Sequence, residues 1–152
     1  MTRREMMKAL AIGSSMLGSV LVPLLSASSA LAEEPKGGAG GQVSPGGGIK
    51  ITKILEQKLP NGKEVTIVTV LFPPGVEEDP HRHPGPVFGY VLEGALTTQV
   101  EPGRVVTYKQ GQAWYEPPLH IHRVARSASN TKPAKILALL IHGMDEALVL
   151  PA

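Results

Sequence analysis

After Ile49 the apolar residues of this chain come in short blocks, and turn-forming residues separate one block from the next. No stretch shows the spacing of three to four residues that marks a long amphipathic helix. Turn pairs such as Glu93-Gly94 and Gln110-Gly111 bound blocks that have the length of β-strands. We therefore predict an all-β domain with strands near residues 49–58, 64–72, 86–93, 95–100, 104–109, 112–116, 121–127 and 134–142.

A closed antiparallel barrel accommodates about eight short strands in a chain of 152 residues, because closure removes the sheet edges that would otherwise pair with other chains. We predict a jelly-roll β-barrel that forms a single domain at residues 49–152. A two-sheet sandwich of the immunoglobulin type is the structural alternative.

The first 32 residues have the layout of a cleavable signal peptide. Arg3 and Arg4 precede an apolar run at residues 9–25, and small residues at 30–32 provide a cleavage site. The arginine pair resembles a twin-arginine export signal, with an ordinary secretory leader or an uncleaved anchor helix as alternatives. Because the run is shorter than the ~20 apolar residues of a membrane span, we expect cleavage after Ala32, no stable span afterwards, and a periplasmic or secreted protein.

Residues 33–48 are rich in glycine, include Pro35 and Pro45, and have almost nothing apolar to bury. This composition favours a disordered, flexible linker over a packed element. We expect folding to begin near Ile49.

Composition excludes several kinds of site. The chain contains no cysteine, which rules out disulfides, thiolate metal sites and cysteine nucleophiles. The predicted signal peptide holds three of the 15 basic and one of the 13 acidic residues, so 12 of each remain. A balanced charge without a basic stripe argues against a nucleic-acid partner. Histidine, aspartate and glutamate must therefore form any site.

Four of the five histidines form two pairs with the same spacing, His81-x-His83 and His120-x-His122. In an extended segment, residues two apart project from the same face, so both members of a pair can reach one cavity. Imidazole nitrogen suits iron, zinc, copper, nickel and manganese. Histidine pairs also arise on solvent-facing strands, so the spacing alone leaves both interpretations open.

The sequence around these pairs resembles the two signature motifs of the cupin superfamily, and the resemblance covers nearly all of the predicted domain. The first motif has the order Gly, His-x-His, Glu, Gly, and its positions are occupied here by Gly75, His81, His83, Val87 and Gly94. The second has the order Gly, Pro, Gly, His, Asn, and its positions are occupied by Gly111, Pro117, Leu119, His122 and Arg126. The departures at 87, 119 and 126 include one expected metal ligand.

The resemblance implies a cupin-type jelly-roll barrel in which His81, His83 and His122 bind one divalent transition metal. Fe(II) or Mn(II) is favoured, and Zn, Ni or Cu also suits imidazole ligands. Val87 cannot coordinate a cation, so the metal would be held by three neutral histidines with open positions for water, dioxygen or substrate. Cupins with three histidine ligands include dioxygenases, which implies a dioxygenase-like oxidoreductase.

Two further residues are candidates for catalysis. Glu116 and His120 precede His122 by six and two positions, and either can replace the missing carboxylate as a fourth ligand or act as a general base. A surface ion pair is the alternative for Glu116, and a solvated barrel rim for His120. We assign no role to His142. The aromatic residues near the motifs either line a pocket or belong to the core, and they are Phe88, Tyr90, Trp114 and Tyr115.

These features predict a metal-dependent enzyme that acts on a small organic molecule chelating the metal through oxygen. A non-oxidative lyase or isomerase and a non-catalytic module that binds a small molecule are the alternatives. The resemblance also allows a homodimer, because cupin barrels often pair through their outer sheet.

Overall fold

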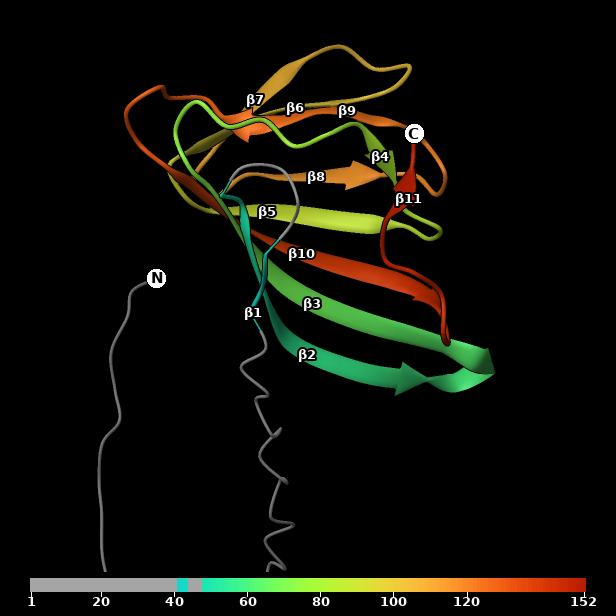
Figure 1. Cartoon of the computed structure of the whole chain (residues 1–152). Coiled ribbons are helices and arrows are strands. Elements are labelled where there is room, and N and C mark those ends of the chain that lie inside the picture. The colour runs from blue at the N-terminus through green and yellow to red at the C-terminus, as the bar shows by residue number, and fades with distance from the viewer. Residues whose placement is uncertain (1–40, 44–47) are drawn as a thin grey trace, which may run out of the picture. The chain divides into compact units, whose positions relative to one another are not determined.

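The computed structural model of this protein describes residues 41–43 and 48–152. These residues form strands and one short 3-10 helix (Figure 1), and none of them belongs to a helix that is long and apolar enough to cross a membrane. In chain order the elements are β1 (Gly41–Val43), β2 (Lys50–Leu59), η1 (Pro60–Gly62), β3 (Lys63–Phe72), β4 (His81–Arg82), β5 (Val87–Glu93), β6 (Ala95–Val100), β7 (Val106–Lys109), β8 (Ala113–Glu116), β9 (His122–Ser127), β10 (Ala134–Gly143) and β11 (Leu150–Pro151).

The strands build two antiparallel sheets. One sheet has six strands in the order β1-β2-β3-β10-β5-β8, and the other has five in the order β11-β4-β9-β6-β7. Strands that are distant in the sequence lie side by side, since β10 pairs with both β3 and β5. Figure 1 shows the chain passing repeatedly from one sheet to the other. The prediction of an all-β jelly-roll domain is confirmed.

The eight predicted strands correspond to β2, β3 and β5 to β10, with ends that differ by up to two residues. Three short strands were not predicted. β1 lies within the predicted linker and pairs with β2, and β11 pairs with β4. These strands have only two or three residues, too few for a periodic pattern, and backbone pairing with a neighbour defines them. The predicted signal peptide and the rest of the linker lie outside the described residues.

The core of the domain lies on the inner face of the six-stranded sheet. Side chains alternate between buried and partly exposed along β3 and β10, as expected for strands with one face on the core. Phe72, at the end of β3, is among the largest fully buried side chains of this face, and Leu96 of β6 joins the same core cluster from the five-stranded sheet. Burying an apolar side chain of this size stabilises the fold by about 1.5–3 kcal/mol, so this layer supplies much of the stability.

The inner face of the five-stranded sheet is more polar. Thr98 and Ser127 are buried there, and so are His81 and His122. Buried polar groups need partners, because an unmade hydrogen bond in the interior costs more than a made one contributes. The barrel therefore combines an apolar wall with a wall of hydrogen-bonding side chains, and the candidate site lies between them.

Candidate metal centre

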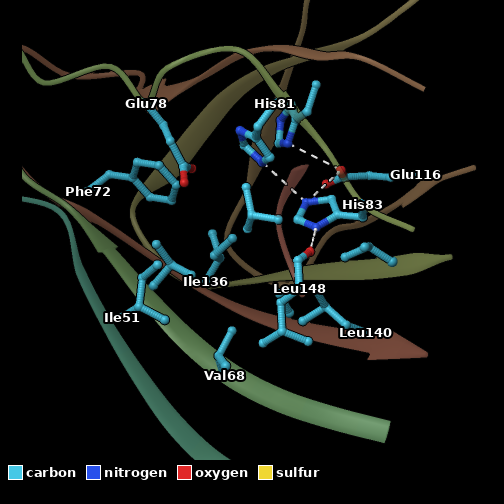
Figure 2. A pocket seen from close by; sticks show the side chains of 15 residues that line it. Ile51, Val68, Phe72, Glu78, His81, His83, Glu116, Ile136, Leu140 and Leu148 are labelled. Carbon is cyan, nitrogen blue, oxygen red and sulfur yellow. Dashed lines mark hydrogen bonds and ion pairs between the residues drawn. The ribbon is translucent and has the colours of Figure 1, made fainter. Parts of the chain in front are cut away.

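Three histidines converge inside the barrel, as the sequence predicts. His81 opens β4, His83 follows that strand directly, and His122 opens β9. β4 pairs with β9 so that His81 stands opposite His122. Each histidine offers one nitrogen, and these three atoms all lie within 4.8 Å of one another. Figure 2 shows the imidazoles of His81 and His83 side by side at one end of the cavity.

Two backbone carbonyls fix the orientation of the first two imidazoles. Nδ1 of His81 donates to the carbonyl of Asp79 at 2.8 Å, and Nδ1 of His83 donates to the carbonyl of Leu148 at 2.7 Å. A neutral imidazole has a single N–H, so both Nε2 atoms are left with lone pairs. Those two Nε2 atoms lie 3.2 Å apart. Two lone pairs at this distance repel each other unless a cation lies between them.

The third imidazole has one nitrogen without a partner. Nε2 of His122 is hydrogen-bonded to Oγ1 of Thr98 at 2.6 Å. Nδ1 of His122 is buried and makes no hydrogen bond in the described part of the chain, although Oε2 of Glu116 approaches it to 3.2 Å. Each histidine thus has one nitrogen held by a protein oxygen and a second nitrogen that is not held by a backbone carbonyl or a hydroxyl group, as is usual for histidines that bind metals.

Glu116 lies at the end of β8 and is 4% exposed. Nε1 of Trp114 donates to its Oε1 at 2.9 Å, and its Oε2 lies 3.7 Å from Nε2 of His83. Burial raises the pKa of Glu116, but His122, His83 and Trp114 together outweigh burial, and the pKa is lowered below 4.5. Glu116 is therefore a carboxylate at neutral pH.

The histidine pKa values follow from the same balance. Burial lowers the pKa of His122, but Glu116, Glu78 and a backbone hydrogen bond at Val124 together outweigh burial, and the pKa is raised above 6.5. At His83 burial prevails and the pKa is lowered below 6.5. A neutral His83 keeps the free Nε2 lone pair that a metal requires.

The donor set fits a divalent transition metal. Ligand atoms that bind one metal at about 2.0–2.2 Å lie about 3–3.5 Å apart when they are neighbours in its coordination shell. The Nε2 atoms of His81 and His83 are 3.2 Å apart, which matches such an edge. Imidazole nitrogen is a donor that iron, manganese, zinc, nickel and copper accept. The cluster of His81, His83 and His122 can therefore hold a metal ion.

A cavity extends from the histidines toward the six-stranded sheet. Apolar side chains line most of it, including Ile51, Val68, Phe72, Ile136 and Leu140 (Figure 2). The ionisable residues in its wall are the three histidines, Glu78 and Glu116. An apolar pocket with a few convergent polar groups is the usual form of a small-molecule site.

Glu78 is a pocket residue that the sequence did not reveal. Its backbone N–H donates to the carbonyl of Ala125 at 2.9 Å, and its carboxyl group points into the cavity beside Phe72 (Figure 2). Burial raises its pKa above 4.5, although His81 and His122 act in the opposite direction. Because Glu78 lies in a loop, strand parity gives no signal for its orientation.

The structure does not bring His120 to the site, which corrects the prediction of a ligand or base at this position. Its side chain is exposed, and its Nδ1 donates to the carbonyl of Glu101 at 2.7 Å. β9 begins only at His122. Leu119, in the preceding turn, has a left-handed backbone with φ of 63°. The same-face rule for extended segments therefore does not apply to residue 120.

The other histidine and the aromatic residues lie outside the cluster. His142 is buried and hydrogen-bonds with Thr66 at 2.9 Å. Trp114 is a core residue, whereas Phe88, Tyr90 and Tyr115 are exposed and do not line the cavity. The latter three alternate with inward-facing residues on β5 and β8, so their side chains project from the outer face.

Residues 68–140 match the model of the cupin domain family. The match spans 73 of the 152 residues, and this region is similar to that family. Similar solved structures include an uncharacterized conserved protein with a double-stranded β-helix domain from Klebsiella pneumoniae subsp. pneumoniae, with 20% identity, a TM-score of 0.56, and coverage of 73% of this chain and 90% of that one. An RmlC-like cupin from Shewanella frigidimarina has 20% identity and a TM-score of 0.56, with coverage of 75% and 95%.

The DMSP lyase DddQ from Ruegeria pomeroyi is also similar to this chain, with 22% identity and a TM-score of 0.51 over 58% of this chain and 43% of that one. No curated protein sequence matches this chain. At these identities the structural likeness supports the cupin fold, and the chemistry must be argued from the residues of the site.

Proposed function

We propose that this protein is a metal-dependent enzyme that acts on a small organic molecule. His81, His83 and His122 hold one divalent transition metal, and the substrate enters the apolar cavity and chelates the metal through oxygen. The observation that supports this proposal most strongly is the pair of facing Nε2 atoms at 3.2 Å, whose lone pairs call for a cation.

Fe(II) or Mn(II) suits a site of this kind, with zinc, nickel or copper as other ions that imidazole accepts. When bound, the metal would supply Lewis acidity, and iron would also supply dioxygen activation. The chain contributes orientation and a dry environment. The carbonyls of Asp79 and Leu148 hold two imidazoles in one tautomer, and the apolar walls keep bulk water from the substrate. We place the reaction among dioxygenase-like oxidoreductases.

A lyase or isomerase reaction without dioxygen is the second candidate, and Glu78 is the observation that favours it. Its carboxyl group faces the cavity, and burial raises its pKa toward the range that suits general acid-base catalysis. Such a group can remove a proton from a bound substrate or return one to a leaving group. One of the similar solved structures is a DMSP lyase.

Elemental analysis of the exported protein, followed by oxygen-uptake assays of the metal-loaded protein with a panel of diketones and catechols, tests the proposal. We expect about one equivalent of iron or manganese per chain and oxygen consumption that is lost in His122→Ala. Turnover that persists without oxygen and is lost in Glu78→Gln would favour the lyase or isomerase. Full metal occupancy without turnover, together with a rise in Tm on adding a small molecule, would instead indicate a binding module and contradict both enzymes.

We also propose that the protein is exported to the periplasm or secreted. The support is the arrangement of Arg3, Arg4 and the apolar run at 9–25. Fractionation of cells that produce the full chain should place it outside the cytoplasm, with an N-terminus at residue 33. Lysine at both arginine positions should cause cytoplasmic accumulation if the twin-arginine route is used, and continued export would favour the ordinary secretory route.

We propose a homodimer as the assembly. Phe88 and Tyr115 are about half exposed on the outer face of the six-stranded sheet, and their rings pack at 5.3 Å. Exposed aromatic clusters of this kind mark interaction surfaces. Light scattering should give twice the mass of the mature chain, and Phe88→Glu should give the monomer mass. A monomeric wild type would contradict the proposal.

A further inference from the structure

The geometry points to Glu116 as the fourth protein ligand of the metal, and this inference rests on the proposed metal centre. Val87 stands where the first cupin motif has its ligating glutamate. In the antiparallel pair of β5 and β8, Val87 and Glu116 are direct partners. We infer that the carboxylate has moved across this strand pair, so that β8 supplies from position 116 what β5 does not supply from position 87.

Cross-strand partners share one region of space. Side chains directly opposite each other in an antiparallel pair have Cβ atoms about 4.5–5.5 Å apart. Val87 and Glu116 both point inward, with 2% and 4% exposure, and both line the cavity. A carboxylate therefore reaches the histidine cluster from either position. The glutamate side chain is flexible enough to make up for the different starting points of the two Cα atoms.

Glu116 lies outside the cluster of three histidines whose ligand atoms are all within 4.8 Å of one another, but it approaches two of them at distances close to those between ligands of one metal. Its Oε2 lies 3.2 Å from Nδ1 of His122 and 3.7 Å from Nε2 of His83. Neighbouring ligand atoms around one metal are separated by about 3–3.5 Å, so one distance fits and the other requires only a small adjustment. Figure 2 shows the carboxylate turned toward the imidazoles, with one oxygen on the side of the cluster.

A second observation concerns the charge of Glu116. Burying a carboxylate is costly unless a cation or several donors compensate it. Among the described residues, the ion pairs of Glu116 are with His83 and His122 alone, and no lysine or arginine compensates it. A metal on the histidines supplies the missing positive charge.

The other carboxylate oxygen is held in place. Nε1 of Trp114 donates to Oε1, so Oε2 is the oxygen that faces His83 and His122. Trp114 can adopt this position because its cross-strand partner is Gly89; a Cβ at residue 89 would lie 2.2 Å from Cζ2 of the indole. A donor that orients a ligating carboxylate is a regular part of metal sites. Gly89, Trp114 and Glu116 thus form one unit that presents Oε2 to the cluster.

Isothermal titration of the metal-free protein with Mn²⁺ tests this inference directly. We expect Glu116→Gln and Glu116→Val to weaken the Kd by at least about 10–100-fold. The decisive variant is the exchange Val87→Glu with Glu116→Val, which returns the carboxylate to β5. This exchange variant should bind Mn²⁺ with a Kd within about 10-fold of wild type, because both positions face the same three imidazoles.

Co²⁺ absorption gives a readout that does not depend on affinity. Loss of an oxygen ligand should change the visible spectrum of the Co²⁺ protein in both single variants, and the exchange variant should restore it. Glu101→Gln is the matched control, since it removes the same charge from an exposed glutamate that pairs with Arg123, and it should leave the Kd and spectrum unchanged. Circular dichroism verifies that each variant is folded.

The outcomes separate this inference from the proposed function. If Glu116→Gln binds Mn²⁺ as tightly as wild type and has an unchanged Co²⁺ spectrum while His122→Ala loses binding, the metal centre stands and the fourth ligand is refuted. If the exchange variant folds but binds Mn²⁺ no better than Glu116→Val, the idea that a carboxylate at 87 or 116 serves the same metal is refuted. If wild type binds no metal, or His122→Ala binds equally well, the metal centre itself is refuted.

Discussion

Trp114→Phe tests how strongly one buried donor holds the Glu116 carboxylate. The Nε1 of Trp114 donates to Oε1 of Glu116 at 2.9 Å, and both side chains are buried. Phenylalanine keeps an aromatic ring near Tyr108, which stacks on Trp114 with 5.5 Å between ring centroids. It has no donor, however, so one oxygen of an ionised, buried carboxylate loses its partner.

The expected loss has two parts. A hydrogen bond to a charged group contributes about 1.5–3 kcal/mol to stability. The smaller ring loses burial and packing worth about another 1 kcal/mol. We therefore expect the free energy of unfolding of the metal-free protein at pH 7 to fall by about 2.5–4 kcal/mol.

Urea denaturation followed by far-UV circular dichroism measures this change, since Trp114 is the single tryptophan and its fluorescence is lost in the variant. A double-mutant cycle with Glu116→Leu separates the hydrogen bond from the packing. The coupling free energy should be about 1.5–3 kcal/mol. A coupling below about 0.5 kcal/mol would show that Trp114 acts through packing alone, and would refute its role in holding the carboxylate.

Three further predictions concern the same region. Burial lowers the pKa of His122, but Glu116, Glu78 and Val124 together outweigh burial and raise it, so the ion pair contributes fully below pH 6.5 and is lost as pH rises through the folded pKa. The pKa of Glu116 is lowered, so its contribution is lost as pH falls below 4.5. The difference in unfolding free energy between metal-free wild type and Glu116→Gln should therefore be largest between pH 4.5 and 6.5, and a difference independent of pH would contradict this pairing. Gly89→Ala places a Cβ 2.2 Å from the Trp114 ring, so we expect a destabilisation of about 1–3 kcal/mol in urea denaturation; an unchanged stability would mean that the indole can move freely. Deleting residues 148–152 removes the Leu148 carbonyl that accepts from His83. Titration with Mn²⁺ should then give a Kd weaker by about 10–100-fold, with the circular dichroism of the barrel retained. An unchanged Kd would exclude a role for this segment in orienting His83.

Most of the barrel can be predicted from the sequence because its strands carry two local signals. Apolar residues alternate along them, as in β3 and β10, and glycine-containing turns separate them, as between β5 and β6. β4 and β11 have neither signal. They exist because Leu150 and Pro151 pair with Arg82 and His81, a contact between segments almost 70 positions apart that no local pattern encodes.

The residues of the candidate site likewise differ in whether a local sequence pattern predicts them. His81, His83 and His122 are predictable, because each pair member has a fixed spacing and the motif places the third ligand. His120 shows where spacing fails, since the parity rule holds only within an extended segment and β9 begins two residues later. Glu78 carries no signal at all, because a loop backbone decides where its carboxyl group points.

Glu116 shows why a motif departure is ambiguous until strand register is known. By sequence, Val87 is a lost ligand, and Glu116 is an acid 29 positions away with a surface ion pair as its simplest explanation. The register of β5 with β8 places the two side chains opposite each other on the inner face of the barrel. A ligating carboxylate can move between two such positions and still face the same imidazoles. The residues around its new position must then bind one carboxylate oxygen and leave the other directed at the cluster. Trp114 and Gly89 meet that condition here, so the position of the carboxylate depends on a tryptophan and a glycine at positions that the two motifs leave unspecified.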